Sequence, residues 1–314
     1  MTYMNTNARQ LCALGFCAFT VPAVLTLPQL GWFWAITASA AGALFLLLLV
    51  FQRRRNPQAI AEQGKYVLLP VLFWNLLMLG VSAARLCDVY PTGNTFPLVG
   101  LLLLLLAVYA AQKGAVLRVG AIVFFFLVLF FALILGFSLP NLHMEWLKPA
   151  FAVDWTCLPI VLVPTVALYL YEGKDSGRLS LWLLGGVGFA GLCALVTVGS
   201  LSNAVAASEN FAFYSAAKSV SVLGAMERLE PLVSAAMTAA GFCLLALLCA
   251  VNGRILERIF PKGKHAAACL NFFVGGGAMW LSGLLPGVVF AIGTTIFWGI
   301  FPLVTLLLGA RKKF

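Results

Sequence analysis

Ten long apolar segments follow one another along this chain, and they constrain its fold more than any other feature. Each approaches the roughly 20 residues that an α-helix needs to cross a hydrocarbon core about 30 Å thick. Hydrophobic residues make up 62% of the 314 residues and charged residues only 10%, whereas soluble domains average about half and a quarter. The sequence therefore predicts a polytopic membrane protein.

The segments are rich in leucine and phenylalanine and show no alternation of apolar and polar residues. This pattern favours helices over a β-barrel, whose strands would be about 10 residues long. We therefore expect a single all-α membrane domain that occupies residues 1–314. The expected spans are 11–30, 32–51, 66–86, 96–111, 115–139, 153–171, 179–201, 229–251, 266–285 and 286–308.

Lysine and arginine are distributed unequally between the loops that these spans define. With ten spans the loops alternate between two sides, and sixteen basic residues fall on one side against four on the other. Because basic residues collect in cytoplasmic loops, we expect a multi-pass protein of the cell membrane with both termini in the cytoplasm. The net charge of +10 follows from this asymmetry and does not indicate nucleic-acid binding. Residues 53–55 form either a cluster beside anionic headgroups or a docking patch for a cytoplasmic partner.

The sequence offers little for catalysis or metal binding. It has no H-E-x-x-H motif, and Asp154 is the only acidic residue expected at a central span, so a catalytic pair of carboxylates is not indicated. The two histidines lie in loops, and the eight cysteines lack C-x-x-C spacing. We expect neither an enzyme nor a metal or cofactor site. The cysteines are interpreted as helix-packing residues, with a Cys87–Cys157 disulfide as the less favoured alternative.

Prolines interrupt the first and sixth spans, which stand five segments apart. Pro22 and Pro28 lie in the first, and Pro159 and Pro164 in the sixth. In a five-plus-five inverted repeat, with halves at about 9–139 and 151–308, these two spans are counterparts, and paired broken helices usually mark a transporter's substrate site. A packed kink is the alternative, because proline is common in membrane helices.

A break frees backbone N–H and C=O groups, which can bind a ligand where they line a cavity. We expect a small-molecule site in the middle of span one and at the start of span six. Polar residues of spans three and eight either contribute to it or hydrogen-bond between helices. The candidate site residues are Phe19, Thr20, Val21, Pro22, Ala23, Asn75, Asp154, Trp155, Thr156, Cys157, Pro159 and Thr238.

The stretch that precedes span eight is amphipathic rather than spanning. It reads FAFYSAAKSVSVLGAMERLEPL over residues 211–232, and we expect an extracellular lid helix that runs into span eight. Glu227, Arg228 and Glu230 form either a gating ion pair or a structural one. In the first case Arg228 reaches Asp154 across the site, and in the second it pairs locally and fixes the start of the helix.

Three stretches carry a resemblance to a known family. They are Tyr109–Gly114 (YAAQKG) followed by Arg118, the run from Lys218 through MERLEPL, and the Leu27-Pro28 pair at the end of span one. They are similar to the spore germination permeases, the B subunits of nutrient germinant receptors. That family belongs to the amino acid, polyamine and organocation transporter superfamily, and the match runs in order along nearly the whole chain.

The resemblance implies a transporter fold of about ten helices with broken helices one and six, and a small-molecule site between those helices. It also implies the receptor's A and C subunits as partners and the spore inner membrane as location. Two functions stay open: germinant sensing by binding an amino acid or similar nutrient, and secondary transport of amino acids or amines coupled to protons or ions. The scarcity of titratable groups at the expected site favours sensing.

Overall fold

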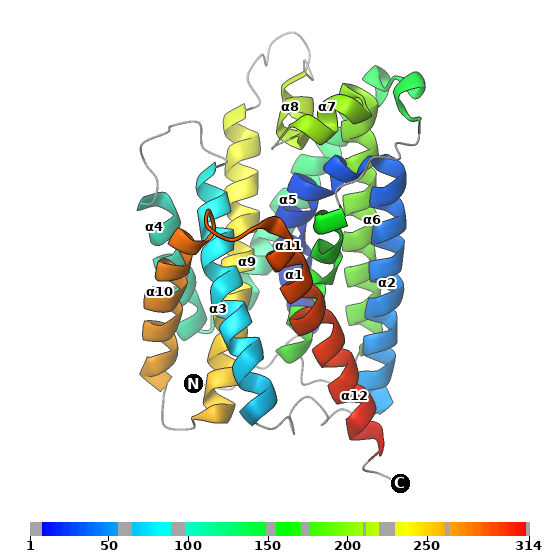
Figure 1. Cartoon of the computed structure of the whole chain (residues 1–314). Coiled ribbons are helices and arrows are strands. Elements are labelled where there is room, and N and C mark those ends of the chain that lie inside the picture. Colours follow the sequence, from blue (N-terminus) through cyan, green and yellow to red (C-terminus); the bar gives the residue numbers. More distant parts are fainter. Residues whose placement is uncertain are drawn as a thin grey trace.

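The computed structural model of this chain describes residues 8–55, 65–88, 98–148, 155–170, 176–209, 212–219, 230–260 and 264–311. All regular structure in these residues is helical, and Figure 1 shows long helices standing side by side. In chain order, the elements are α1 Ala8–Thr26, η1 Leu27–Leu30, α2 Trp32–Arg55, α3 Lys65–Asp88, α4 Leu98–Gln112, α5 Val116–Ser138, η2 Leu139–Asn141, η3 Met144–Trp146, η4 Trp155–Tyr169, α6 Ser176–Leu201, α7 Asn203–Ser208, α8 Ala212–Ser219, α9 Glu230–Ile259, α10 Lys264–Leu281, α11 Gly287–Thr294, η5 Thr295–Ile300 and α12 Phe301–Arg311.

Five of the described helical stretches are long and apolar enough to cross a membrane, and five shorter ones are also apolar. The long ones are Trp32–Gln52, Val67–Cys87, Val116–Ser138, Leu232–Ile259 and Gly287–Thr305. The shorter ones are Arg9–Val24, Leu98–Gln112, Thr156–Tyr169, Gly185–Leu201 and Ala266–Leu281. Together they coincide in order with the ten segments expected from sequence, and the largest difference is α9, which continues past residue 251 to Ile259.

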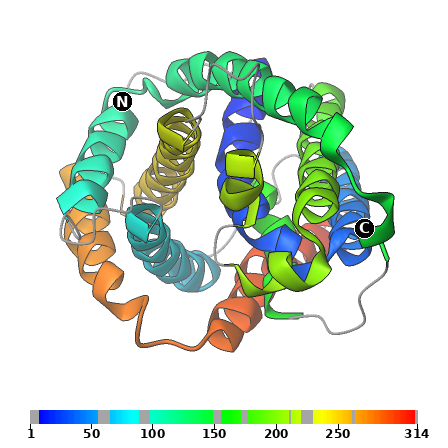
Figure 2. The ribbon, with the colours of Figure 1, turned by 90° about the horizontal axis from the view of Figure 1, so that it is seen from above.

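The helices form an inner group and an outer ring. Figure 2 shows α1, α3 and α9 enclosed by α2, α4, α5, α6, α10 and the α11–α12 helix. The apolar windows of α3 and α9 are 72% buried, whereas that of α5 is 39% buried. Phe125 of α5 and Phe273 of α10 lie on the outside of the ring, where lipid rather than water would cover them. This is the arrangement of a multi-pass helical membrane protein.

The first span departs from the expected break. α1 continues as an α-helix through Pro22 to Thr26, and the chain tightens into the 3-10 turn η1 only at Leu27, next to Pro28. The expectation of a break centred on residues 19–23 is therefore wrong for this structure. A proline removes one backbone hydrogen bond, and the packing of α1 against α5, α6, α9 and η4 holds the helix together across that gap.

The sixth span is a single 3-10 helix rather than two α-helical halves. η4 runs from Trp155 to Tyr169 and contains both Pro159 and Pro164. Its 15 residues reach about 30 Å at roughly 2.0 Å per residue, whereas an α-helix of that length would reach about 22 Å. The stretched form therefore lets a short apolar segment match a hydrocarbon core about 30 Å thick. The two prolines disfavour the α-helical alternative, because each ring clashes with the carbonyl four residues earlier.

Short helices cover the upper face in Figure 1. α7 and α8 lie there together with the turns η2 and η3. The η2–η3 segment is held by His143, whose backbone N–H donates to the Gly199 carbonyl at 3.0 Å, and by Trp32, whose indole donates to the Leu147 carbonyl at 2.9 Å. The amide of Asn203 donates to the carbonyls of Trp146 and Lys148. Residues 220–229 of the expected lid lie outside the described residues.

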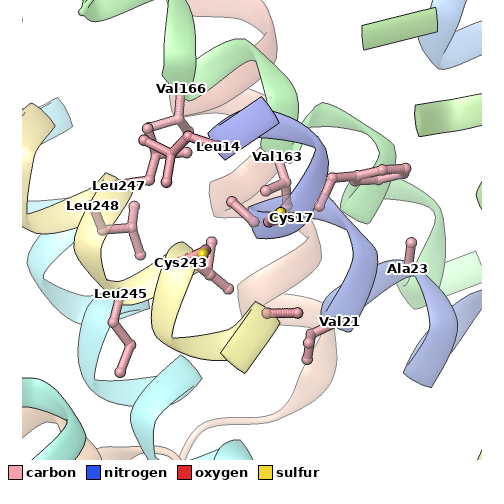
Figure 3. Packing of buried hydrophobic residues seen from close by; sticks show 14 of the residues in the cluster. Leu14, Cys17, Val21, Ala23, Val163, Val166, Cys243, Leu245, Leu247 and Leu248 are labelled. Carbon is pink, nitrogen blue, oxygen red and sulfur yellow. The ribbon is translucent and has the colours of Figure 1, made fainter. Parts of the chain in front are cut away.

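Cysteines pack in the core where α1, α9 and η4 meet (Figure 3). Figure 3 shows Cys17 of α1 and Cys243 of α9 among leucine and valine side chains, with Val163 and Val166 of η4 on the same cluster. Both of these cysteines are buried, and none of the eight cysteines is part of a disulfide. The Cys87–Cys157 disulfide is therefore not formed in this structure.

Candidate ligand-binding site

The centre of the expected site lies where α1 packs against η4 and α9. Phe19, Thr20, Val21 and Ala23 are buried there, and Pro22 is half-buried. The side chains of α1 are thus enclosed by neighbouring helices on nearly every side. A ligand at this level would contact α1 only after local rearrangement of the surrounding helices.

Hydroxyl groups at the expected site are engaged within their own helices. Thr20 Oγ1 donates to the Phe16 carbonyl at 2.8 Å, and Thr238 Oγ1 donates to the Ser234 carbonyl at 2.7 Å. This bond to the carbonyl four residues earlier is a common arrangement for threonine in membrane helices. A hydroxyl that donates its single proton retains two lone pairs, so Thr20 remains chemically suited to accept a bond from a ligand's N–H group.

The start of η4 is the most open part of the expected site. Thr156, Cys157 and Pro159 are half-buried. The thiol of Cys157 lies 3.5 Å from Gln29 Oε1, and Thr156 Oγ1 lies 3.7 Å from the position of a Cβ on Gly287 of α11. The first turn of η4 is therefore placed between η1 and the start of the last span.

Five of the expected site residues lie outside the described side chains. Trp155 is the first residue of η4 and Glu230 the first residue of α9. Asp154, Glu227 and Arg228 lie outside the described residues. The expected ion pair among Glu227, Arg228 and Glu230, and its alternative with Asp154, therefore remain predictions.

Asn75 makes the interhelical bond that was one of its two expected roles. Its side chain is fully buried in α3, and Oδ1 accepts a hydrogen bond from Trp298 Nε1 at 2.7 Å. Its Nδ2 atom is buried and has no hydrogen-bond partner. Asn75 thus faces η5 of the last span, and its connection with η4 runs through Trp298, whose carbonyl accepts from Thr165 Oγ1 at 2.8 Å.

Sequence reasoning missed Gln29, Thr165 and Trp298. Gln29 connects the site to the upper face, because its Nε2 donates to the Glu209 carbonyl at 3.3 Å while its Oε1 faces Cys157. Glu209 in turn accepts from Ser215 of α8 at 3.3 Å. A glutamine directly after the Leu-Pro pair was the one available signal, since polar residues are scarce in these segments.

The described polar side chains in the interior of the bundle are neutral. Among the residues whose side chains the structure describes, the buried polar ones are all uncharged: Thr20, Ser39, Asn75, Ser138, Thr165, Thr197, Ser234, Asn252, Asn271 and Thr294. Arg254 and Glu257 form an ion pair at 3.8 Å near the end of α9, and both are partly exposed. The described site can therefore offer hydroxyls, amides and backbone groups, but no fixed charge.

The helical bundle, its apolar surface and its neutral interior define a multi-pass α-helical membrane protein. Comparison with protein families gives a match to the family described as spore germination protein (Spore_permease), over residues 88–282. Since this is more than half of the chain, the protein belongs to that family, and the resemblance seen in the sequence is confirmed. No curated protein matches the chain.

Proposed function

We propose that this protein binds a small nutrient germinant, such as an amino acid, where α1, η1, η4 and α9 meet, and that it acts in germinant sensing within a receptor complex. Family membership supports a germination-related membrane permease. The observation that carries the site is η4, a 3-10 helix of 15 residues. Runs longer than three or four residues are uncommon in this conformation, and such stretches often mark functional hinges.

The two counterpart spans support a five-plus-five inverted repeat. Both leave the regular α-helical form at prolines, the first at η1, which contains Pro28, and the sixth throughout η4. Backbone groups in such stretches bind the polar groups of small ligands in transporter folds. The ten-helix repeat and its central site are thus part of the proposal.

The neutral interior favours a ligand without net charge. Burial of an unpaired charge in a membrane interior is expensive, and the described buried residues supply no counter-charge. A zwitterionic amino acid carries both signs, and helix ends and freed backbone groups can accommodate each. A coupled transporter would need a titratable group, for which Asp154 is the candidate.

Ligand-induced stabilisation tests the binding site. The full chain in lipid nanodiscs is heated with each proteinogenic amino acid added singly, and at least one should raise the melting temperature, because binding to the folded state alone stabilises it. Thr20→Val should lower the apparent affinity for that amino acid about three- to tenfold, the usual range for one lost hydrogen bond. Thr197→Val is the matched control, since Thr197 is buried in α6 and donates to the Cys193 carbonyl of the same helix at 2.7 Å.

Two results would contradict this proposal. The first is that none of the amino acids shifts the melting temperature. The second is that Thr20→Val and Thr197→Val change the apparent affinity equally. Accumulation of an amino acid against its gradient in proteoliposomes would instead favour the coupled transporter.

The receptor role has its own test. The resemblance to B subunits motivates a complex with A and C subunits in the spore inner membrane. An affinity-tagged full chain expressed in sporulating cells should co-purify with both subunits from spore inner membranes solubilised in mild detergent. Recovery of the chain without either subunit would count against the receptor complex and leave ligand binding unaffected.

A further inference from the structure

Trp298 joins three elements through two hydrogen bonds. Its indole N–H donates to Asn75 Oδ1 of α3 at 2.7 Å, and its backbone carbonyl accepts from Thr165 Oγ1 of η4 at 2.8 Å. Trp298 is 1% exposed, and Asn75 and Thr165 are fully buried. One residue of the last span therefore hydrogen-bonds to both η4 and α3.

Pro302 explains why the Trp298 carbonyl is available to η4. Proline has no N–H group and its ring clashes with the carbonyl four residues earlier, which is that of Trp298. The helix widens into the π segment η5, Thr295–Ile300, directly before this proline. In membrane helices, carbonyls freed in this way are commonly satisfied by a threonine or serine of a neighbouring helix. Thr165 serves that purpose here.

The Thr165 hydroxyl is shared between two helices. Oγ1 lies 2.7 Å from the Leu162 carbonyl of its own helix and 2.8 Å from the Trp298 carbonyl. A hydroxyl has one proton to donate, so these carbonyls compete for it. A movement of η4 relative to the last span would shift that balance.

The α3 side of this connection has little freedom. The Trp74 ring stacks on Phe297 with centroids 5.5 Å apart, and it lies so close to Gly293 that a Cβ there would overlap the ring. Asn75 Nδ2 has no partner, so the side chain depends on Trp298 for its hydrogen bond. If η5 moved without α3, the whole Asn75 amide would be buried unpaired, which is strongly unfavourable.

We propose that Trp298 is a positioning residue that couples η4 to α3, so that a ligand-induced movement of η4 is transmitted to α3 through the last span. The role of η4 as the ligand-binding element rests on the proposed function. The coupling between the two helices does not require a ligand and is testable without one.

Hydrogen exchange of the full chain in nanodiscs tests the coupling. Thr165→Val removes the hydroxyl from η4 with little change of shape, and it should speed amide exchange near Asn75 in α3 as well as in η4. The expected change is about three- to tenfold, the range for one lost hydrogen bond. Trp298→Phe should do the same in both segments. If Thr165→Val changes exchange in η4 alone, the coupling is overturned, and this variant decides the matter even if Trp298→Phe does not fold.

Two matched controls separate coupling from general loosening. Trp74→Phe removes a neighbouring indole whose buried Nε1 has no hydrogen-bond partner, and it should leave exchange in η4 unchanged. Thr197→Val removes a buried hydroxyl that donates to a carbonyl of its own helix α6, and it should leave exchange in both η4 and α3 unchanged. Faster exchange in η4 and α3 for either control, equal to that of Thr165→Val, would contradict a specific role of Trp298.

Addition of the proteinogenic amino acids separates this inference from the proposed function. An amino acid that binds should slow exchange in η4 and α3 of the unmodified protein, but only in η4 of Trp298→Phe. Equal protection of α3 in both proteins would overturn the positioning role while ligand binding stands. If no amino acid binds but Thr165→Val still affects α3, the proposed function fails and the coupling stands.

Discussion

Gly31 and Ser202 adopt the same unusual backbone conformation. Gly31 has φ 75° and ψ 158°, and Ser202 has φ 76° and ψ 158°. This region is essentially restricted to glycine, because a Cβ clashes with the backbone there. Gly31 joins η1 to α2 without that penalty. Ser202, which joins α6 to α7, is the one described non-glycine residue with a positive φ, and it stores strain at the base of the upper short helices.

Substitutions at these two positions should change the unfolding free energy in opposite directions. Ser202→Gly should raise the unfolding free energy by about 1 kcal/mol, because relief of the strain outweighs the entropy that glycine adds to the unfolded chain. Gly31→Ala should lower it by about 1–3 kcal/mol. Denaturant unfolding in detergent micelles measures both. A destabilised Ser202→Gly protein would show that the serine side chain contributes more than the backbone costs.

At the level of the elements, apolar length predicted where the helices lie but not their form. The approximate borders of α2 to α6 could be predicted from hydrophobicity, because a span that crosses the hydrocarbon core consists mainly of apolar residues. The conformation of η4 could not be predicted from the sequence, since prolines at 159 and 164 are compatible with a kinked α-helix or with a 3-10 helix. The packing of α1 decided that Pro22 is tolerated, and such packing depends on all of its neighbours at once.

The candidate site was only partly predictable for a related reason. Asn75 was singled out because an amide inside a span needs a partner, but that partner is Trp298, 223 positions away. Thr165 and Trp298 are likewise 133 positions apart. Nothing in the sequence near Thr165 or Trp298 distinguishes them from other packing residues in apolar helices. Their roles can be recognised only in the three-dimensional arrangement.

Gln29 should control access to the start of η4. It faces Cys157 on one side and donates to the Glu209 carbonyl on the other, which ties the end of α7 to η1. Gln29→Leu removes both polar contacts with little loss of volume, and it should speed reaction of Cys157 with a membrane-impermeant thiol reagent several-fold. Labelling is followed by mass spectrometry, with Cys157→Ser as the blank. An unchanged rate would mean that other contacts hold the upper helices in place.

At the scale of the whole molecule, most of the described basic residues lie on the face where α1 begins and α12 ends. α1 begins and α12 ends at the lower face in Figure 1, and α4 and α5 are joined on that side by a turn that contains Lys113, with Arg118 in the first turn of α5. α9 ends there too, with Arg254 and Arg258 in its last turns. Among the described residues, the basic ones on the opposite side are Arg85, Lys148 and Lys218. Such an asymmetry predicts that the lower face is cytoplasmic.

Cysteine accessibility in cells tests this orientation. In a Cys157→Ser, Cys269→Ser background, the remaining cysteines are buried, so an added cysteine reports its own side. Lys148→Cys should react with an impermeant maleimide in intact cells, whereas Lys113→Cys should react only after permeabilisation. Each added cysteine removes one basic residue, a small part of a bias of sixteen against four, so neither change should invert the protein. Labelling in the reverse order would place both termini outside and would require the site near η1 and η4 to open toward the cytoplasm.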